Sequence, residues 1–396
     1  MADYTQNLKT FENALKVNYL PAWNNMLTTE PTALLAKIKT ISLANNEIVA
    51  TAPIGIGGGF GYGEEGAATP ASGNVMFKRF NAKAKDMYDN ITISAKAVRL
   101  AKSPGAMADA LETETKAAYE SAKWNVGRSL FGNGTGKLAV VASATGATAT
   151  VDNCKYLKEG LIVDVYASGA AVGSVPANAG LRIVAINRDT KVVTFSTTPA
   201  TISANSFITV QNSYGREITG LGAIFDSSVT SLYGLVKADN PFLAPTVKTT
   251  ETAAIDDSYF TSVIRDVETY KNSKIDMLLC GNTAYDSYAA SLAAYNRRIE
   301  DNSHTLTGGF KALTFIFANR VVDIVNEPFI PDDEVWGFDT TTLQLHQQQW
   351  SFAELQGGGI FNLMENQSVY RALLCNYGEL ICTNPGGCVK IKMASA

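Results

Sequence analysis

The sequence predicts an α+β protein that carries an inserted all-β domain. Three observations support this prediction. A long helix is marked at both ends around residues 104–131, short apolar runs alternate with turn residues over residues 137–219, and helices and buried strands share residues 220–396. With 396 residues the chain corresponds to two or three domains of roughly 150 residues, so it can bury a core without disulfides.

The composition excludes several classes of protein. Hydrophobic residues make up 46% and charged residues 18% of the chain, which excludes a wholly disordered protein. A net charge of −4 offers no general cationic surface for nucleic acid or an anionic membrane. The sequence contains no run of about 18 apolar residues, the length that a membrane-spanning helix needs. The five scattered cysteines and the lack of a signal-peptide pattern lead us to expect reduced thiols and intracellular synthesis.

Residues 1–50 are predicted to form an N-terminal arm, because they hold too few apolar residues for a domain. A short helix is expected before Pro21, which would break it, and a second short helix is expected near residues 34–38. The arm therefore needs a surface elsewhere to cover its few apolar side chains.

Residues 51–102 are predicted to form a glycine-rich lead and a long hairpin. The lead, residues 51–72, has the composition of a loop. From Met87 polar and apolar residues alternate as in a strand, and residues 75–81 supply a partner strand, so residues 73–102 would form a ribbon on the order of 50 Å long. A lone hairpin is marginal in water, so we expect something outside it to cover its apolar face.

The charges are distributed unevenly along the chain. Residues 73–102 carry seven Lys or Arg against two Asp, whereas residues 226–396 carry 12 basic and 20 acidic residues. This asymmetry is compatible with nucleic-acid contact, and equally with docking of the basic part of one copy on the acidic part of another.

Residues 103–136 contain the best-marked element, a helix about 40 Å long. Ser103 is placed to cap it, Pro104 occupies its first position, and it stops at Gly132. One narrow stripe of mostly small side chains predicts close approach of a neighbouring sheet or arm.

Residues 137–219 are predicted to be an independent insert, a small all-β sandwich or barrel. Beyond it, residues 220–396 return to mixed α and β structure. A helix is expected from about Asp257, with Tyr270 on its apolar face, followed by a buried strand, a second helix after Asn282, and then mainly strands.

No motif supports a catalytic, cofactor or metal site. GYGEEG at 61–66 matches a dinucleotide loop by its letters, but no helix follows it and acidic residues replace the phosphate position. GNGTGK at 132–137 ends a helix instead of opening one. Cys382 and Cys388 are too widely spaced for an ordinary zinc pair, so buried, idle thiols are the favoured interpretation.

The order of these parts resembles the major capsid proteins of tailed bacteriophages, which have the Hong Kong 97 fold. The resemblance is carried by GEEGAATP before the hairpin, ALETETKAAYESAKWNVGRSLFGNGTG in the long helix, ITGLGAIFD after the insert and YRALLCNYGELICTNPGG near the end. It covers the chain apart from the insert. It implies that residues 1–50 are the N-arm, 51–102 the lead and extended E-loop, 103–136 the spine helix and start of the P-domain, and 220–396 the A-domain and returning P-domain strands.

The resemblance also implies partners and a location. We expect a non-enzymatic shell protein of the virion, assembled in the host cytoplasm as hexamers and pentamers around double-stranded DNA that it contacts without sequence preference. A portal is expected at one vertex. A separate scaffolding protein is also expected, because the first 50 residues are too short for a built-in scaffold. The insert could instead be a surface module for host glycans or a decoration protein.

The residues expected to contact a neighbouring subunit lie on the predicted hairpin: Lys78, Arg79, Lys83, Lys85, Ile91 and Ile93. The arm and the hairpin lack cores of their own, so their burial would come from other copies, and many repeated contacts would close a shell. The alternatives are an encapsulin-like compartment that encloses cargo enzymes, and an enzyme that binds a nucleotide at its glycine-rich loops.

Overall fold

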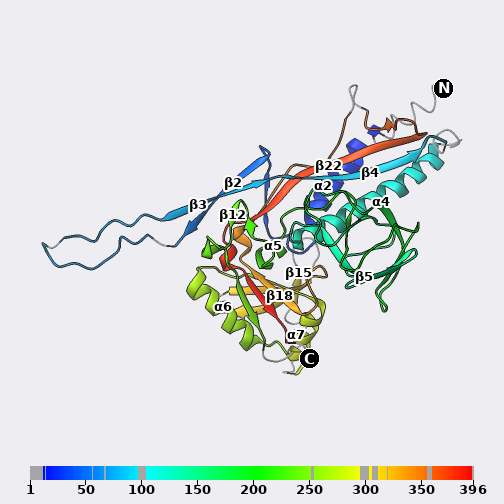
Figure 1. Cartoon of the computed structure of the whole chain (residues 1–396). Coiled ribbons are helices and arrows are strands. Elements are labelled where there is room, and N and C mark those ends of the chain that lie inside the picture. Colours follow the sequence, from blue (N-terminus) through cyan, green and yellow to red (C-terminus); the bar gives the residue numbers. More distant parts are fainter. Residues whose placement is uncertain are drawn as a thin grey trace. The chain divides into compact units, whose positions relative to one another are not determined.

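The computed structural model describes residues 12–13, 15–55, 57–66, 68–96, 104–250, 254–294, 303–305, 311–318, 320–354 and 359–394. The chain divides into two compact units, each assembled from three segments. Unit 1 comprises Met1–Pro31, Lys85–Ala223 and Trp350–Asn376, and unit 2 comprises Thr32–Ala84, Ile224–Gln349 and Tyr377–Ala396. Figure 1 traces both units along the chain. Within the described residues, no helix has the length and apolar character needed to cross a membrane.

Unit 1 is organised around the helix α4 (Pro104–Phe131), as predicted. Ser103, its expected cap, lies outside the described residues. Ala118 and Ala122 are buried on one face of the helix, in a core shared with the strand β4 (Lys85–Ser94). The small side chains of Ala118 and Ala122 let strand and helix approach closely, as expected for this part of the stripe. The burial of its other predicted members, Met107, Ala110 and Leu111, lies outside what the structure describes.

The arm differs from its prediction in two places. Pro21 does not break the helix; it lies in the first turn of α2 (Leu20–Thr29), where a missing N–H is not needed, and the π-helix η1 (Leu15–Tyr19) precedes it. Residues 34–38 form a turn rather than a helix, with the N–H groups of Lys37 and Ile38 both donating to the carbonyl of Leu34.

A six-stranded sheet is built on the long strand β22 (Val369–Cys382), which belongs to unit 1 at its start and to unit 2 at its end. In unit 1, β22 pairs with β4, β20 (Ser351–Phe352) and β21 (Asn362–Leu363). In unit 2, its last residues pair with β19 (Leu343–Gln347), which pairs in turn with β1 (Lys39–Ser42).

The insert is a closed barrel with strand order β10-β5-β6-β9-β8-β7, which confirms the all-β prediction. Alternate residues of its strands point inward, and Val141, Val163 and Ile208 are fully buried there. Its six strands are β5 (Lys137–Thr145), β6 (Thr148–Val151), β7 (Ile162–Tyr166), β8 (Asn178–Asn187), β9 (Val192–Phe195) and β10 (Phe207–Val210).

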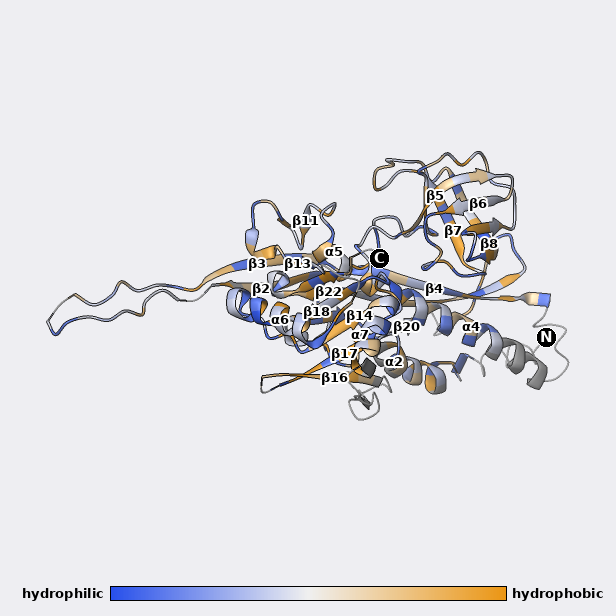
Figure 2. Ribbon diagram, turned by 90° about the horizontal axis from the view of Figure 1, so that it is seen from below, coloured by the Kyte–Doolittle hydropathy of each residue, from blue (hydrophilic) through white to orange (hydrophobic). Residues whose placement is uncertain are grey.

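Unit 2 contains a seven-stranded mixed sheet with order β13-β23-β18-β14-β17-β16-β15, and the hydrophobic colour of Figure 2 marks β14 as apolar. The helices α6 (Asp257–Lys271) and α7 (Asn282–Ala294) pack on it through a common apolar core. Both helices confirm their predictions, except that Tyr270 is 79% exposed. The strands are β13 (Thr246–Thr249), β14 (Met277–Cys280), β15 (Ser303–Thr305), β16 (Lys311–Phe317), β17 (Arg320–Asn326), β18 (Glu334–Phe338) and β23 (Val389–Lys392).

Short elements lie along the chain between the longer helices and strands described above. Their bounds are α5 (Gly222–Phe225), β11 (Ser231–Leu232), β12 (Leu235–Val236), η2 (Pro241–Leu243), η4 (Thr340–Thr342) and η5 (Pro385–Gly387). The strands β11 and β12 pair with each other in a two-stranded sheet. Tyr233, which lies between them, has a φ of 49°, a left-handed conformation that is uncommon for a side chain of this size.

The hairpin is displaced along the chain from its predicted position. β3 (Met76–Lys83) pairs antiparallel with β2 (Glu47–Ile54), not with β4. Glu47 lies opposite Lys83 and Ile54 opposite Met76, so the glycine-rich residues 55–75 form the end of the hairpin rather than a lead into it. The prediction of a ribbon over residues 73–102 is therefore wrong, because the partner of β4 is the distant strand β22 and no local pattern reveals that pairing.

Candidate assembly surface

The β2–β3 hairpin exposes large apolar side chains along its length. Phe60 and Tyr62 are 82% and 94% exposed, and Met76 and Phe77 are 68% and 64% exposed. Figure 1 shows the hairpin extending away from the rest of unit 2. A cluster of this kind on an extended ribbon is typical of a protein–protein contact rather than of a solvent-facing loop.

Glycine allows the two arms of the hairpin end to lie against each other. A β-carbon on Gly73 would lie 2.4 Å from the backbone nitrogen of Gly58, and one on Gly61 would lie 2.8 Å from the ring of Pro70. The two arms thus approach more closely than any larger residue permits. The aromatic rings of Phe60 and Tyr62 pack edge to face, with centroids 5.3 Å apart, and project from this narrow ribbon.

The base of the hairpin is anchored in unit 2 by Phe80 and Tyr233. Phe80 is fully buried and its ring lies 5.5 Å from that of Tyr233 and 6.3 Å from that of Phe242. The N–H of Asn81 donates to the carbonyl of Tyr233 at 3.0 Å. The hydroxyl of Tyr233 accepts from the N–H of Cys382 at 3.1 Å, and burial raises the pKa of this phenol, which stays neutral.

The four cations predicted on the hairpin are found in two different environments. Lys78, Arg79 and Lys83 lie on β3 and are exposed, and within the described residues no salt bridge joins any of them to an acidic group. Arg79 Nε donates to Asn81 Oδ1 at 3.0 Å. Lys85 lies on β4 in unit 1 and is half-buried.

Ile91 and Ile93 require a correction. They were expected to face a neighbouring subunit, but they are 1% and 8% exposed and lie in the core of unit 1. The helices α2 and α4 supply the apolar partners that the sequence interpretation sought in another molecule. The two isoleucines hold unit 1 together and are not accessible for docking.

The sequence interpretation missed the aromatic residues of the hairpin end. The composition of the segment GFGYG predicts a loop because glycine dominates it, and this prediction gives the two aromatic side chains no role. Their signal is visible in retrospect, because a loop that only connects strands has no need of Phe60 and Tyr62. Met76 and Phe77 were assigned to a strand without a prediction of which face they occupy.

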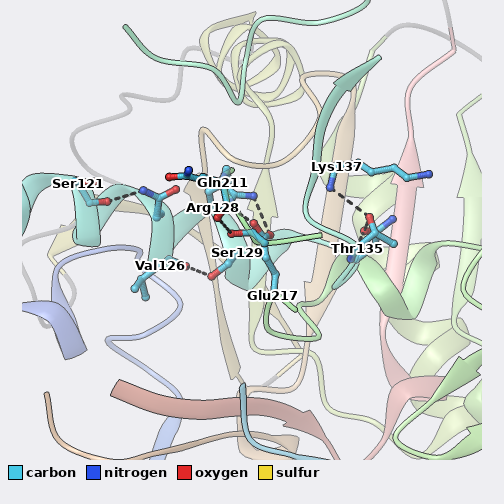
Figure 3. A network of polar contacts seen from close by, with 11 residues as sticks. Ser121, Val126, Arg128, Ser129, Thr135, Lys137, Gln211 and Glu217 are labelled. Carbon is cyan, nitrogen blue, oxygen red and sulfur yellow. Dashed lines mark hydrogen bonds and ion pairs between the residues drawn. The ribbon is translucent and has the colours of Figure 1, made fainter. Parts of the chain in front are cut away.

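A buried ion pair fixes the stem of the barrel to the helix α4 within unit 1, as Figure 3 shows. Arg128 donates to both carboxylate oxygens of Glu217, at 3.0 and 2.6 Å, and both side chains are less than a tenth exposed. The same guanidinium lies 5.8 Å from the ring of Trp124. Nζ of Lys158, from the barrel, lies 4.9 Å from the centroid of the same ring.

Backbone contacts complete the stem. The N–H of Gly215 donates to the carbonyl of Thr135, and that of Leu221 to the carbonyl of Leu130, both at 2.8 Å. Gly220 packs so closely on the end of α4 that a β-carbon there would lie 2.5 Å from the carbonyl oxygen of Leu130. The chain segments that lead into and out of the barrel are therefore held together at the C-terminal end of α4.

The described residues contain no group of three or more His, Cys, Asp or Glu side chains that could hold a metal ion. The five cysteines are unbonded and buried. Within unit 2, the exposed apolar side chains of the β2–β3 hairpin are the feature typical of a surface that binds another macromolecule.

Structural comparison places this architecture among phage capsids. The chain superposes on a chain of the cyanophage A-1(L) capsid asymmetric unit with a TM-score of 0.55 and 9% sequence identity, over 91% of each chain. The chain has the Hong Kong 97 capsid fold.

Two further structures of the capsid fold are similar at lower scores. The holo-SrpI encapsulin complex of Synechococcus elongatus PCC 7942 gives a TM-score of 0.47 with 8% identity, over 92% of this chain and 88% of that one. The capsid of a native GTA particle gives 0.47 with 8% identity, over 92% and 91%. The sequence itself matches no family model and no curated protein.

Proposed function

We propose that this protein is the major capsid protein of a tailed bacteriophage, and that copies of it assemble into the icosahedral head that encloses double-stranded DNA. The observation that carries the proposal is the hairpin with four large apolar side chains, Phe60, Tyr62, Met76 and Phe77, that the chain itself leaves exposed. Exposing such a surface on a lone subunit is unfavourable, and covering it with a second copy is the simplest way to bury it.

Under this proposal the protein acts as a structural component and not as an enzyme. Repetition of one contact around a closed ring yields hexamers and pentamers, which tile an icosahedral shell. A separate scaffolding protein guides assembly, a portal occupies one vertex, and the inner surface meets packaged DNA without sequence preference. The barrel is a fixed part of each subunit that a decoration protein could use.

Assembly of purified protein tests this function. We expect the wild-type chain to form closed shells that are visible by electron microscopy and sediment as particles. The variant Phe60→Ser/Tyr62→Ser should remain folded, because both residues are exposed, and should lose shell formation by at least about tenfold. The matched control Val172→Ser/Val175→Ser removes two apolar side chains of comparable exposure from a barrel loop and should assemble normally.

The absence of this protein from any shell, both in the purified material over a wide concentration range and in particles recovered from infected cells, would reject the proposed function. Nucleic acid content separates a virus head from a compartment of the encapsulin kind. Particles recovered from infected cells should contain DNA, whereas particles of pure protein with enclosed enzymes would favour the compartment.

A further inference from the structure

Two of the buried cysteines lie side by side in unit 2. Cys382 ends β22 and Cys388 precedes β23, and the 3-10 turn η5 between them brings their sulfur atoms to 3.7 Å. Both side chains are buried, at 0% and 1% exposure. A disulfide needs a sulfur–sulfur distance of about 2.05 Å, so the two sulfur atoms, 3.7 Å apart, must approach each other further before a bond forms.

The turn that carries the two thiols is closely packed against neighbouring residues. A β-carbon on Gly386 would lie 2.3 Å from the carbonyl oxygen of Phe242, and one on Gly387 would lie 2.5 Å from Cβ of Ser273. The side chain of Asn384 closes the turn by accepting from the N–H of Gly387 at 3.2 Å. The two sulfur atoms are therefore brought together by a closely packed turn.

The cysteine pair lies directly behind the anchor of the hairpin. The N–H of Cys382 donates to the hydroxyl of Tyr233, and Tyr233 holds the hairpin through the ring of Phe80 and the N–H of Asn81. A covalent bond between residues 382 and 388 would join the end of β22 to the start of β23 beneath this anchor. Without this bond, movement at the junction of β22 and β23 would be transmitted to the base of the hairpin.

We propose that Cys382 and Cys388 are a disulfide site whose closure secures the anchor of the hairpin. The oxidant is a low-molecular-weight disulfide. One thiolate attacks it and releases one small thiol, and the second cysteine then displaces the other, so that two S–H bonds and one S–S bond break while one protein S–S bond forms and two small thiols carry away the protons and electrons. The hydrogen bond with Cys382 and burial raise the pKa of Cys388, so closure is slow near neutral pH and faster in alkali.

The remaining cysteines provide internal controls for this assignment. Cys154, Cys280 and Cys375 have no sulfur partner among the described residues, and burial raises the pKa of Cys280. We therefore expect one specific bond and no mixture of pairings. In terms of the proposed function, the bond would form after a particle leaves the reducing interior of the cell.

The test uses the full-length wild-type chain, reduced and then incubated with oxidised glutathione at about pH 8. After denaturation and alkylation, mass spectrometry should find two thiols lost and a Cys382–Cys388 cross-linked peptide, while the other three cysteines react fully. Hydrogen exchange at the Asn81 amide should slow by at least about threefold in the oxidised protein. The control variant Cys154→Ser should behave identically, and Cys388→Ser should show neither change.

Alkylation of all five cysteines after oxidation would overturn the proposal, as would a mixed glutathione adduct at Cys388. A cross-linked peptide with unchanged Asn81 exchange would reject the link to the hairpin anchor. None of these results depends on shell formation, so failure here and failure of the proposed function are distinguishable. Absence of particles would leave the thiol result intact.

Discussion

At the scale of single residues, the acidic group least suited to its surroundings is Asp89. It lies on the inward face of β4, the face that carries Ile91 and Ile93, and its Oδ2 atom is buried without a hydrogen bond. Burial raises its pKa from 3.8 to about 6, although the N–H of Asn90 partly offsets this by donating to Oδ1 at 2.8 Å. Folding therefore favours the protonated form of this carboxyl.

The pH dependence of unfolding should reveal Asp89. Because the folded pKa exceeds the unfolded one, its favourable contribution is complete below about pH 4 and is lost as the pH rises through about 6. Asp89→Asn should therefore raise the free energy of unfolding at pH 7 to 8 by about 2–3 kcal/mol, measured by urea denaturation. The control Asp86→Asn, on the exposed face of the same strand, should change it by less than about 0.5 kcal/mol. Equal midpoints for Asp89→Asn and wild type at pH 8 would contradict the assignment.

At the scale of elements, one strand performs two separate tasks. Phe80 of β3 is fully buried against Tyr233 and Phe242, whereas Phe77, three residues earlier, is 64% exposed. The two phenylalanines lie on opposite faces of the strand, because side chains alternate along it. One therefore anchors the hairpin and the other is available to a neighbour.

Two alanine substitutions should separate these tasks. Phe80→Ala should lower the free energy of unfolding by about 3–5 kcal/mol, because it leaves a cavity in a packed site. Phe77→Ala should change it by less than about 0.5 kcal/mol and should reduce shell yield. Thermal denaturation of dissociated subunits and sedimentation of assembled material measure the two effects. The interpretation of β3 fails if Phe77→Ala unfolds the chain as strongly as Phe80→Ala does.

The barrel is an element that can be removed cleanly from unit 1. Lys137 of β5 and Thr209 of β10 are register partners in adjacent antiparallel strands, so their Cα atoms lie about 5 Å apart. A two-residue Asn-Gly turn can join them in place of residues 138–208. The stem contacts Arg128–Glu217 and Thr135–Gly215 are kept in this variant.

We expect the barrel-deleted chain to fold, with the circular dichroism signal of α4 retained. Loss of the contact between Lys158 and Trp124 should cost about 1 kcal/mol at most. Electron microscopy then tells whether the barrel is needed for closure of the head or is displayed on it. A deletion variant that is unfolded would show that the barrel is part of the core of unit 1.

At the scale of the whole molecule, charge acts alongside apolar burial. Residues 73–102 are basic and residues 226–396 are acidic, and Lys78, Arg79 and Lys83 are exposed and form no salt bridge in the described part of their own chain. Such charges gain partners when one copy meets another, and they steer the encounter. Their effect is screened beyond about 10 Å at 0.1 M salt.

Reversal of the hairpin charges tests this contribution. The variant in which Lys78, Arg79 and Lys83 are all replaced by Glu should assemble at least about tenfold more slowly at low salt, because like charges then face each other. Light scattering across a salt series measures this rate, which for the wild type should fall as salt rises. Shells that form at normal yield with unchanged salt tolerance would reject an electrostatic role for the hairpin.

Elements marked by local chemistry could be predicted from the sequence alone. Pro104 and Gly132 bracket α4, the periodic residues after Asp257 mark α6, and regular turns divide the barrel strands, because capping, periodicity and turn geometry are decided within a few residues. The order of these elements sufficed to indicate a capsid fold.

Pairing between distant strands was decided only by the tertiary structure. β4 pairs with β22, almost 300 residues away along the chain, and β3 pairs with β2 instead. The hairpin therefore has the glycine-rich segment at its end, and Ile91 and Ile93 of β4 are buried within their own chain. Two consecutive segments with alternating polar and apolar residues are compatible with a hairpin and also with pairing to distant strands. The alternation shows which face of a strand is apolar, but not which element covers that face. The sequence thus determined the elements and their order, whereas the competition among strands for partners determined which surface is left for another molecule.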